Sequence, residues 1–165
     1  MWAPWRIGYV AGDRPSGCVF CRKVEANDDE AEFVLFRGKH TAVVLNTYPY
    51  NSGHLMVVPY AHVAELWDLT SEAHEELWEL TRLAAQALRQ ALSPQGMNIG
   101  MNIGQAAGAG ISDHLHMHIV PRWQGDTNYM TSVAETRVVP QSLEDSFRQL
   151  RPVIAELAAA SSKRP

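Results

Sequence analysis

His114-Leu-His-Met-His-Ile-Val-Pro121 is the stretch of this sequence that most constrains its fold. Three of the seven histidines of the chain stand here at alternate positions, each followed by an apolar residue. Side chains along a β-strand point to opposite faces in turn, so the alternation places the imidazoles on one face and the apolar side chains on the other. The apolar face can pack on a core, and we therefore expect the histidine face to line something polar.

Length and composition indicate a single domain with an ordinary core. The chain has 165 residues, of which 46% are hydrophobic. Its formal net charge of −4 disfavours nucleic acid as a partner. We expect neither a membrane span nor a signal peptide, because no apolar run is long enough for either. Two cysteines without an export signal are typical of a reducing compartment, so we expect a cytoplasmic protein.

Four further strands are predicted by short runs rich in β-branched and aromatic residues and bounded by Gly, Pro and Asn. They lie around Phe33 and Leu35 and at residues 41–45, 54–59 and 97–104. The last is the tandem repeat Met97-Asn-Ile-Gly-Met-Asn-Ile-Gly104, whose Asn/Gly face would let a ligand or a neighbour approach the backbone.

Two helices are predicted by apolar residues at helical spacing. The first runs from Thr70 or Ser71 to about Leu92, with acidic residues early and arginines late, as the helix dipole favours. The second begins near Leu143 and should kink or restart at Pro152.

Short turns rather than crossovers join the predicted strands, which favours the α+β class. We expect one antiparallel sheet of about five strands, packed against one long helix and a C-terminal helix. Residues 1–17 are interpreted as an N-terminal arm and residues 161–165 as a frayed tail, so that residues 1–165 form one domain.

The histidine strand has three interpretations. It could be a polar sheet face in solvent, although histidine is an uncommon choice for one. Imidazoles at alternate positions could share a zinc ion. Alternatively, one imidazole could act as the nucleophile in phosphoryl transfer while a second assists the leaving group. The Gly/Ala loop at residues 104–110 favours the third interpretation, because its small residues can turn several backbone N–H groups towards an anion.

The stretch from His114 to Val120 resembles the signature of the histidine triad family of nucleotide hydrolases and transferases, in which three histidines alternate with apolar residues. The resemblance covers roughly residues 18–129 and includes Asn46, eight residues before His54, and Asn102 before the glycine loop. Three other segments resemble the bacterial branch that contains diadenosine polyphosphate phosphorylases: Trp2-Ala-Pro-Trp-Arg6, the run from Asn46 to His54, and Val120-Pro-Arg-Trp123.

The resemblance implies roles for three histidines. His116 would attack the α-phosphorus and carry the nucleotidyl group as a covalent phosphoramidate. His118 would hydrogen-bond the phosphate and assist the leaving group. His54 would support the triad from the neighbouring strand.

The resemblance also implies a nucleotide site with an apolar base pocket. Asn46 would bind the ribose, while Asn102 and the backbone at Gly110 would hold phosphate oxygens. Some phosphorylase relatives have a serine where Gly110 stands, so here Ser112 is the nearby hydroxyl. Trp123 is interpreted either as a neighbour of the nucleotide or as a core or dimer aromatic.

Cys18-Val-Phe-Cys21 is compatible with two buried free thiols or with half of a zinc site. In several relatives a structural zinc is held by such a pair, a histidine after the third strand and the first histidine of the triad. His62 and His114 match those positions, so the resemblance implies a structural zinc. No redox cofactor is expected.

The resemblance therefore implies a homodimeric enzyme that acts on an adenine nucleotide or a dinucleoside polyphosphate through His116. Inorganic phosphate as acceptor would give ATP and ADP from diadenosine tetraphosphate, whereas water would give AMP. Two other classes stay open: a hydrolase that uses all three triad histidines as zinc ligands, and a nucleotide-binding module without turnover.

Overall fold

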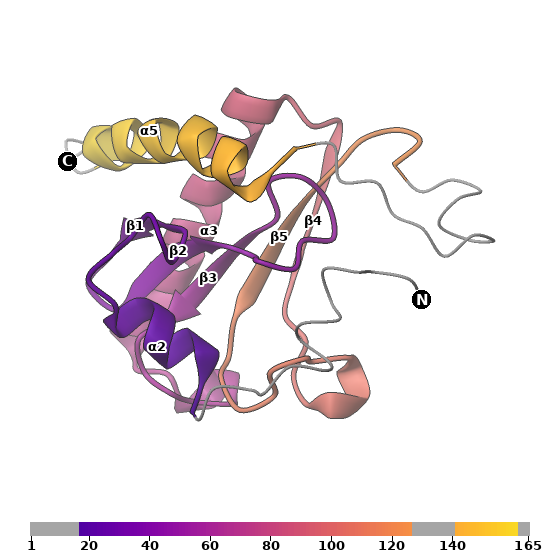
Figure 1. Ribbon diagram of the computed structural model, residues 1–165. Coiled ribbons are helices and arrows are strands. Elements are labelled where there is room, and N and C mark those ends of the chain that lie inside the picture. The colour runs from indigo at the N-terminus through magenta and orange to yellow at the C-terminus, as the bar shows by residue number, and fades with distance from the viewer. Residues whose placement is uncertain (1–16, 127–140, 162–165) are drawn as a thin grey trace.

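The computed structural model describes residues 17–126 and 141–161. Its five strands form one antiparallel sheet in the order β1-β2-β3-β5-β4 (Figure 1). The strands are β1 (Val34–Arg37), β2 (Thr41–Leu45), β3 (Leu55–Pro59), β4 (Gly96–Gly100) and β5 (Met117–Arg122). The helices are α2 (Val19–Glu25), α3 (Ser71–Leu92) and α5 (Leu143–Ser161), with short 3-10 turns at Leu66–Asp68 and Gln105–Ala107. The α+β class and the antiparallel sheet are thus confirmed.

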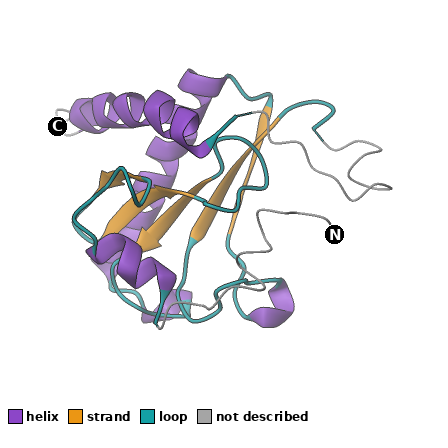
Figure 2. Cartoon of the chain, in the orientation of Figure 1, coloured by secondary structure: helices purple, strands orange, loops and turns teal. Residues whose placement is uncertain are grey.

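One face of the sheet packs against α3 and α5 (Figure 2). Met117 and Ile119 of the histidine strand contribute to this core, as the alternation predicts. The helix residues that complete it keep the 3.6-residue period, for example Leu77, Leu80 and Leu88 on α3. α3 begins where expected, because Thr70 caps it by accepting a hydrogen bond from the Ala73 N–H, and it ends at Ser93 in the left-handed conformation.

The other face of the sheet carries a smaller core under α2, in which Phe20 and Val24 pack against β1, β2 and β3. Strands β2 and β3 are therefore buried on both faces. His118 pairs with Met56 across β3 and β5, and cross-strand partners share a face. The triad side of β5 therefore faces α2.

Glu76 of α3 ties the β1–β2 turn to the helix. Its carboxylate accepts hydrogen bonds from the backbone N–H groups of Lys39, His40 and Thr41 at 2.6–2.7 Å. Burial opposes ionisation of Glu76, but these hydrogen bonds outweigh it and lower its pKa.

The sequence patterns mispredict some boundaries. The helix α2 is not among the predicted elements, because it has only seven residues and the buried Lys23 interrupts its apolar spacing. The strand β5 begins at Met117, so of the three triad histidines only His118 lies in the regular strand. The helix α5 runs through Pro152 as one element, with Leu150 and Ile154 in the core on either side of the proline.

The strand β4 ends at Gly100 rather than Gly104, and Gly104 adopts a positive φ of 78° in the loop that follows. The predicted N-terminal arm, except Gly17, and the tail after Ser161 lie outside the described residues. Among the residues described, no helix has both the length and the apolar character that a bilayer crossing requires.

Candidate active site and metal cluster

A cavity of about 760 Å³ lies between α2, the ends of β2 and β5, and the glycine loop, a size typical of small-molecule sites. The structure brings six of the predicted site residues together in its wall: Asn46, Asn102, Gly110, Ser112, His116 and His118. These residues come from positions as far apart as 46 and 118, so the tertiary fold assembles the site.

His116 lines the cavity, and within the described part of the chain only one of its ring nitrogens is hydrogen-bonded. Its Nδ1 lies 2.9 Å from the main-chain oxygen of His114. A carbonyl can only accept, so Nδ1 must carry the proton and Nε2 keeps its lone pair. The ring is 5% exposed and packs on Phe20 at 4.7 Å between ring centroids. Burial lowers the pKa of His116, and in the neutral ring the hydrogen bond from Nδ1 leaves Nε2 with its lone pair, the state that a nucleophile requires.

The tautomer of His118 is fixed through His54. The Tyr50 N–H donates to His54 Nδ1 at 3.1 Å, so the proton of His54 sits on Nε2. That Nε2 lies 3.0 Å from His118 Nδ1 and donates to it. The proton of His118 is consequently on Nε2, and His118 can donate it to a ligand in the cavity.

Burial keeps both cavity histidines neutral near pH 7. It lowers the pKa of His118 to about 4, and the neighbouring His116 ring adds to the shift. The pKa of His116 is also lowered by burial, against the opposing effect of its hydrogen bond to the His114 carbonyl. The ring centroids of His116 and His118 lie 4.6 Å apart. The Nε2 of His116 bears a lone pair, whereas the Nε2 of His118 bears a proton.

Asn46 follows β2 and is positioned by its own turn. Its Oδ1 accepts the Tyr48 N–H at 2.9 Å, and its Nδ2 lies 3.3 Å from His54 Nδ1. Asn46 therefore links the cavity wall to the buried histidine that orients His118. Its predicted ribose contact, like the phosphate contacts of Asn102, Gly110 and Ser112, stays a prediction.

Trp123 is not among the described residues that line the cavity. The backbone N–H of Trp123 donates at 3.1 Å to the carboxylate of Asp126, which also accepts from Arg122 and Asn51. This network fixes the turn after β5. The cavity therefore lends no support to a contact between Trp123 and a nucleotide, and that role stays a prediction.

His114 is not among the described residues that line the cavity, and it joins a cluster of two thiols and two imidazoles. The Cys18 Sγ lies 3.2 Å from His114 Nδ1, and the Cys21 Sγ lies 3.3 Å from His62 Nδ1. All four potential ligand atoms lie within 4.8 Å of one another. In a tetrahedral zinc site neighbouring ligand atoms are about 3.3–3.8 Å apart, given the usual Zn–N and Zn–S bond lengths.

The donor set fits a tetrahedral metal with no open position. His114 Nε2 donates to the main-chain oxygen of Pro59 at 2.9 Å, which leaves Nδ1 bare towards the thiols. A carbonyl that accepts from the remote ring nitrogen is the usual way to orient a histidine ligand. The four ligands that the resemblance implies therefore lie together, and the two cysteines are not joined by a disulfide.

Several cavity residues escaped the sequence patterns. Tyr48 and Tyr50 line the cavity from a loop and Gln105 from the short 3-10 turn, and apolar periodicity carries no information in either place. Lys23 and Glu32 also line it, so the wall of the cavity carries charged side chains besides the triad, while the expected apolar base pocket stays a prediction. The sequence offered one signal for Lys23. Its charge stands at a position where the spacing of a helix calls for an apolar residue.

Comparison with known proteins places this geometry in a family. The HIT domain matches residues 27–125, more than half of the chain. The chain belongs to the histidine triad (HIT) family. A protein named AP-4-A phosphorylase from Mycobacterium tuberculosis is 40% identical to this HIT protein over 158 residues, which cover 91% of this chain and 81% of the relative.

Two further relatives bear on the chemistry. A bis(5'-nucleosyl)-tetraphosphatase from Schizosaccharomyces pombe is 34% identical over 93 residues, 56% of this HIT protein and 50% of the relative. A crystal structure of a Zn-bound histidine triad family protein from Mycobacterium smegmatis superposes with a TM-score of 0.70 at 30% identity, covering 87% of this chain and 97% of the other.

Proposed function

We propose that this HIT protein is a nucleotidyltransferase that cleaves diadenosine tetraphosphate with inorganic phosphate to give ATP and ADP. The observation that carries the proposal is the free Nε2 of His116, held in a cavity beside the N–H of His118. The relative named AP-4-A phosphorylase, which this chain matches over most of its length, supports the substrate and the acceptor.

In the first step, His116 Nε2 forms a bond to the α-phosphorus while the bond from that phosphorus to the bridging oxygen breaks. ATP leaves and AMP stays on His116 as a phosphoramidate. The ring becomes positively charged, and the His114 carbonyl that accepts from Nδ1–H stabilises this charge. The Nε2–H of His118 donates to the departing oxygen.

In the second step, a phosphate oxygen attacks the same phosphorus and the P–N bond breaks. ADP leaves and His116 regains its lone pair. If water attacks instead, AMP is released. Hydrolysis is the alternative function, and it is favoured by the relative named bis(5'-nucleosyl)-tetraphosphatase.

The deciding experiment measures products from diadenosine tetraphosphate with and without millimolar phosphate, in the wild type and in His116→Ala. Phosphate-dependent formation of ATP and ADP that the variant lacks supports the phosphorylase. AMP release that is independent of phosphate supports the hydrolase. Turnover that survives His116→Ala rules out the mechanism.

Metal removal, a search for a covalent adduct at His116 and a measurement of AMP binding separate the two remaining classes. A hydrolase with all three triad histidines on zinc would lose activity with the metal and form no adduct at His116. It is disfavoured because His114 Nδ1 faces Cys18 and Cys21, and His114 is not among the described residues that line the cavity. A binding module would retain AMP without any turnover.

The Cys18–Cys21–His62–His114 cluster would hold a structural zinc. The Zn-bound relative from Mycobacterium smegmatis supports this assignment. Bound zinc would cross-link the start of α2, the loop after β3 and the residues that lead into β5. Because four protein atoms fill its coordination, it would hold the fold and leave the chemistry to His116 and His118.

A homodimer is also part of the proposal. The strand β4 is an edge of the sheet, and Ile99 on it is 47% exposed, so a second copy would cover an apolar edge. Light scattering at micromolar concentration tests this. The free thiols of Cys18 and Cys21 agree with the reducing cytoplasm that we expect for the protein.

A further inference from the structure

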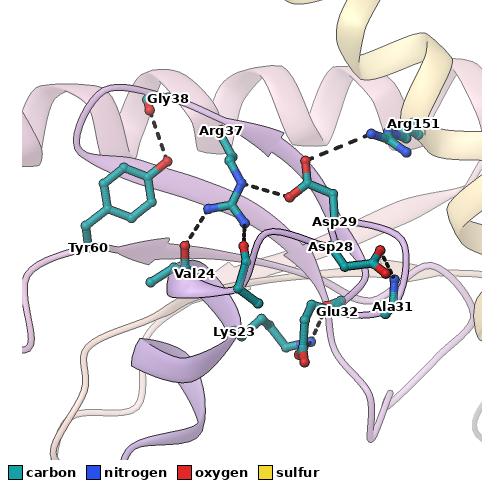
Figure 3. Close-up of polar contacts among 11 residues, drawn as sticks. Lys23, Val24, Asp28, Asp29, Ala31, Glu32, Arg37, Gly38, Tyr60 and Arg151 are labelled. Carbon is teal, nitrogen blue, oxygen red and sulfur yellow. Dashed lines mark hydrogen bonds and ion pairs between the residues drawn. The ribbon is translucent and has the colours of Figure 1, made fainter.

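The cavity contains a pair of opposite charges that the chemistry above does not use. Lys23 on α2 and Glu32, just before β1, both line it. Lys23 is only 5% exposed. Its Nζ donates to the main-chain oxygen of Glu32 and lies 3.5 Å from Oε2 of the same residue (Figure 3).

The backbone around this pair is firmly held. Arg37 of β1 donates to the carbonyls of Val24 and Ala26, the latter at 2.8 Å, which ties down the C-terminal end of α2 (Figure 3). The loop that carries Glu32 is closed by a hydrogen bond of 3.0 Å from the Ala31 N–H to Asp28. Hydrogen-bonding groups on a fixed backbone can discriminate between ligands that differ in donor and acceptor positions.

The pair lies beyond the nucleophile, along α2. Phe20 contacts the His116 ring, and Lys23 follows Phe20 by three residues, about 5 Å further along the helix on the same side. Glu32 neutralises Lys23, and its carboxylate would repel a phosphate. The pair therefore suits a neutral polar group. In a nucleotide whose α-phosphate lies at His116, that group is the base, on the far side of the ribose.

We propose that Lys23 and Glu32 select adenine by its 6-amino edge. The Glu32 carboxylate accepts a hydrogen bond from the amino group, and an N–H of Lys23 donates to the adjacent ring nitrogen. Hypoxanthine carries an oxygen in place of the amino group, and this oxygen would face the carboxylate. The proposal rests on the proposed function and adds to it the residues that read the base.

The test compares kcat/KM for diadenosine and diinosine tetraphosphate, with phosphate present, in the wild type and in three variants. The wild type should prefer the adenine substrate about tenfold or more. Glu32→Gln should reduce the preference towards unity, because an amide can present either its oxygen or its N–H. Lys23→Met should lower kcat/KM for the adenine substrate. Glu30→Gln, an exposed change in the same loop, should leave the preference unaltered.

Equal use of both substrates by the wild type overturns the proposal, as does a Glu32→Gln protein that keeps the wild-type preference. The wild-type comparison needs no variant to fold. If neither substrate turns over, the proposed function fails separately. Calorimetric binding of AMP and IMP to the wild type then tests the pair alone: tenfold tighter binding of AMP supports it, and equal affinity overturns it.

Discussion

His114 and His116 are two residues apart in one sequence pattern, yet they serve two different regions of the molecule. His114 donates from Nε2 to the Pro59 carbonyl and turns Nδ1 to the thiols of Cys18 and Cys21. His116 donates from Nδ1 to the His114 carbonyl and keeps Nε2 for the cavity. The thiol–imidazole cluster and the cavity therefore face opposite nitrogens of equivalent rings.

The difference teaches that the backbone acceptor, more than the histidine itself, decides what each ring can do. A neutral imidazole has one proton, and whichever nitrogen donates to a carbonyl leaves the other as the base, the nucleophile or the ligand. His118 follows the same rule with a different partner, the buried His54 in place of a carbonyl. His54 donates to His118 Nδ1, so the proton of His118 lies on Nε2 and this nitrogen is a donor.

The largest effect should separate the two regions directly. His116→Ala should lower turnover of diadenosine tetraphosphate at least about 1000-fold, because the nucleophile is lost. His114→Ala should instead lower the melting temperature and the zinc content. Steady-state kinetics, calorimetry and metal analysis on both variants check this. If His114→Ala abolishes turnover in a protein that is still folded and zinc-loaded, the separation is wrong.

The next effect isolates the metal cluster. Cys18→Ser combined with Cys21→Ser should lose the metal and lower the melting temperature by about 10 °C, since a bound structural metal contributes to folding free energy. The folded fraction should keep its turnover within about tenfold. Chelation of the wild type, followed by zinc readdition, is the matched control. Unchanged melting and zinc content would show that the cluster holds no metal.

A smaller effect tests the relay to His118. His54→Phe keeps a ring but removes the donor to His118 Nδ1, and should lower kcat about 10–100-fold while altering its pH profile. His54→Gln, whose amide can still donate and accept, should recover part of the loss. A purely structural role for His54 would lower stability in both variants without moving the pH profile.

The smallest effect concerns stability at mildly acidic pH. The unfolded chain takes up protons on histidine near pH 6.5, whereas folded His118 does so only near its lowered pKa of about 4. The unfolded state therefore binds more protons in this window, and stability falls as the pH drops from about 6.5 to 4. Urea unfolding at several pH values measures this. His118→Gln should flatten the dependence, and an unchanged slope would contradict the assignment.

Most of the fold was predictable because apolar periodicity is a local property. The helix at residues 71–92 and the strand at residues 41–45 appear as predicted, since packing and propensity agree there. The helix α2 was missed because a charged Lys23 occupies a buried position, where its partner Glu32 lies outside the helix. The burial of Lys23 could be predicted only with knowledge of the cavity that it lines.

The sequence alone determined the alternation of histidines and apolar residues, the spacing of Cys18 and Cys21, and membership of the HIT family. It predicted the imidazoles on one side of a core strand because a strand has a period of two, although only His118 lies in the regular strand. Only the tertiary structure decided which nitrogen of each ring is free. That choice depends on partners distant in the chain: Pro59 is 55 residues from His114, and His54 is 64 residues from His118. Local patterns carry no information about such partners, because folding alone brings them within hydrogen-bonding distance.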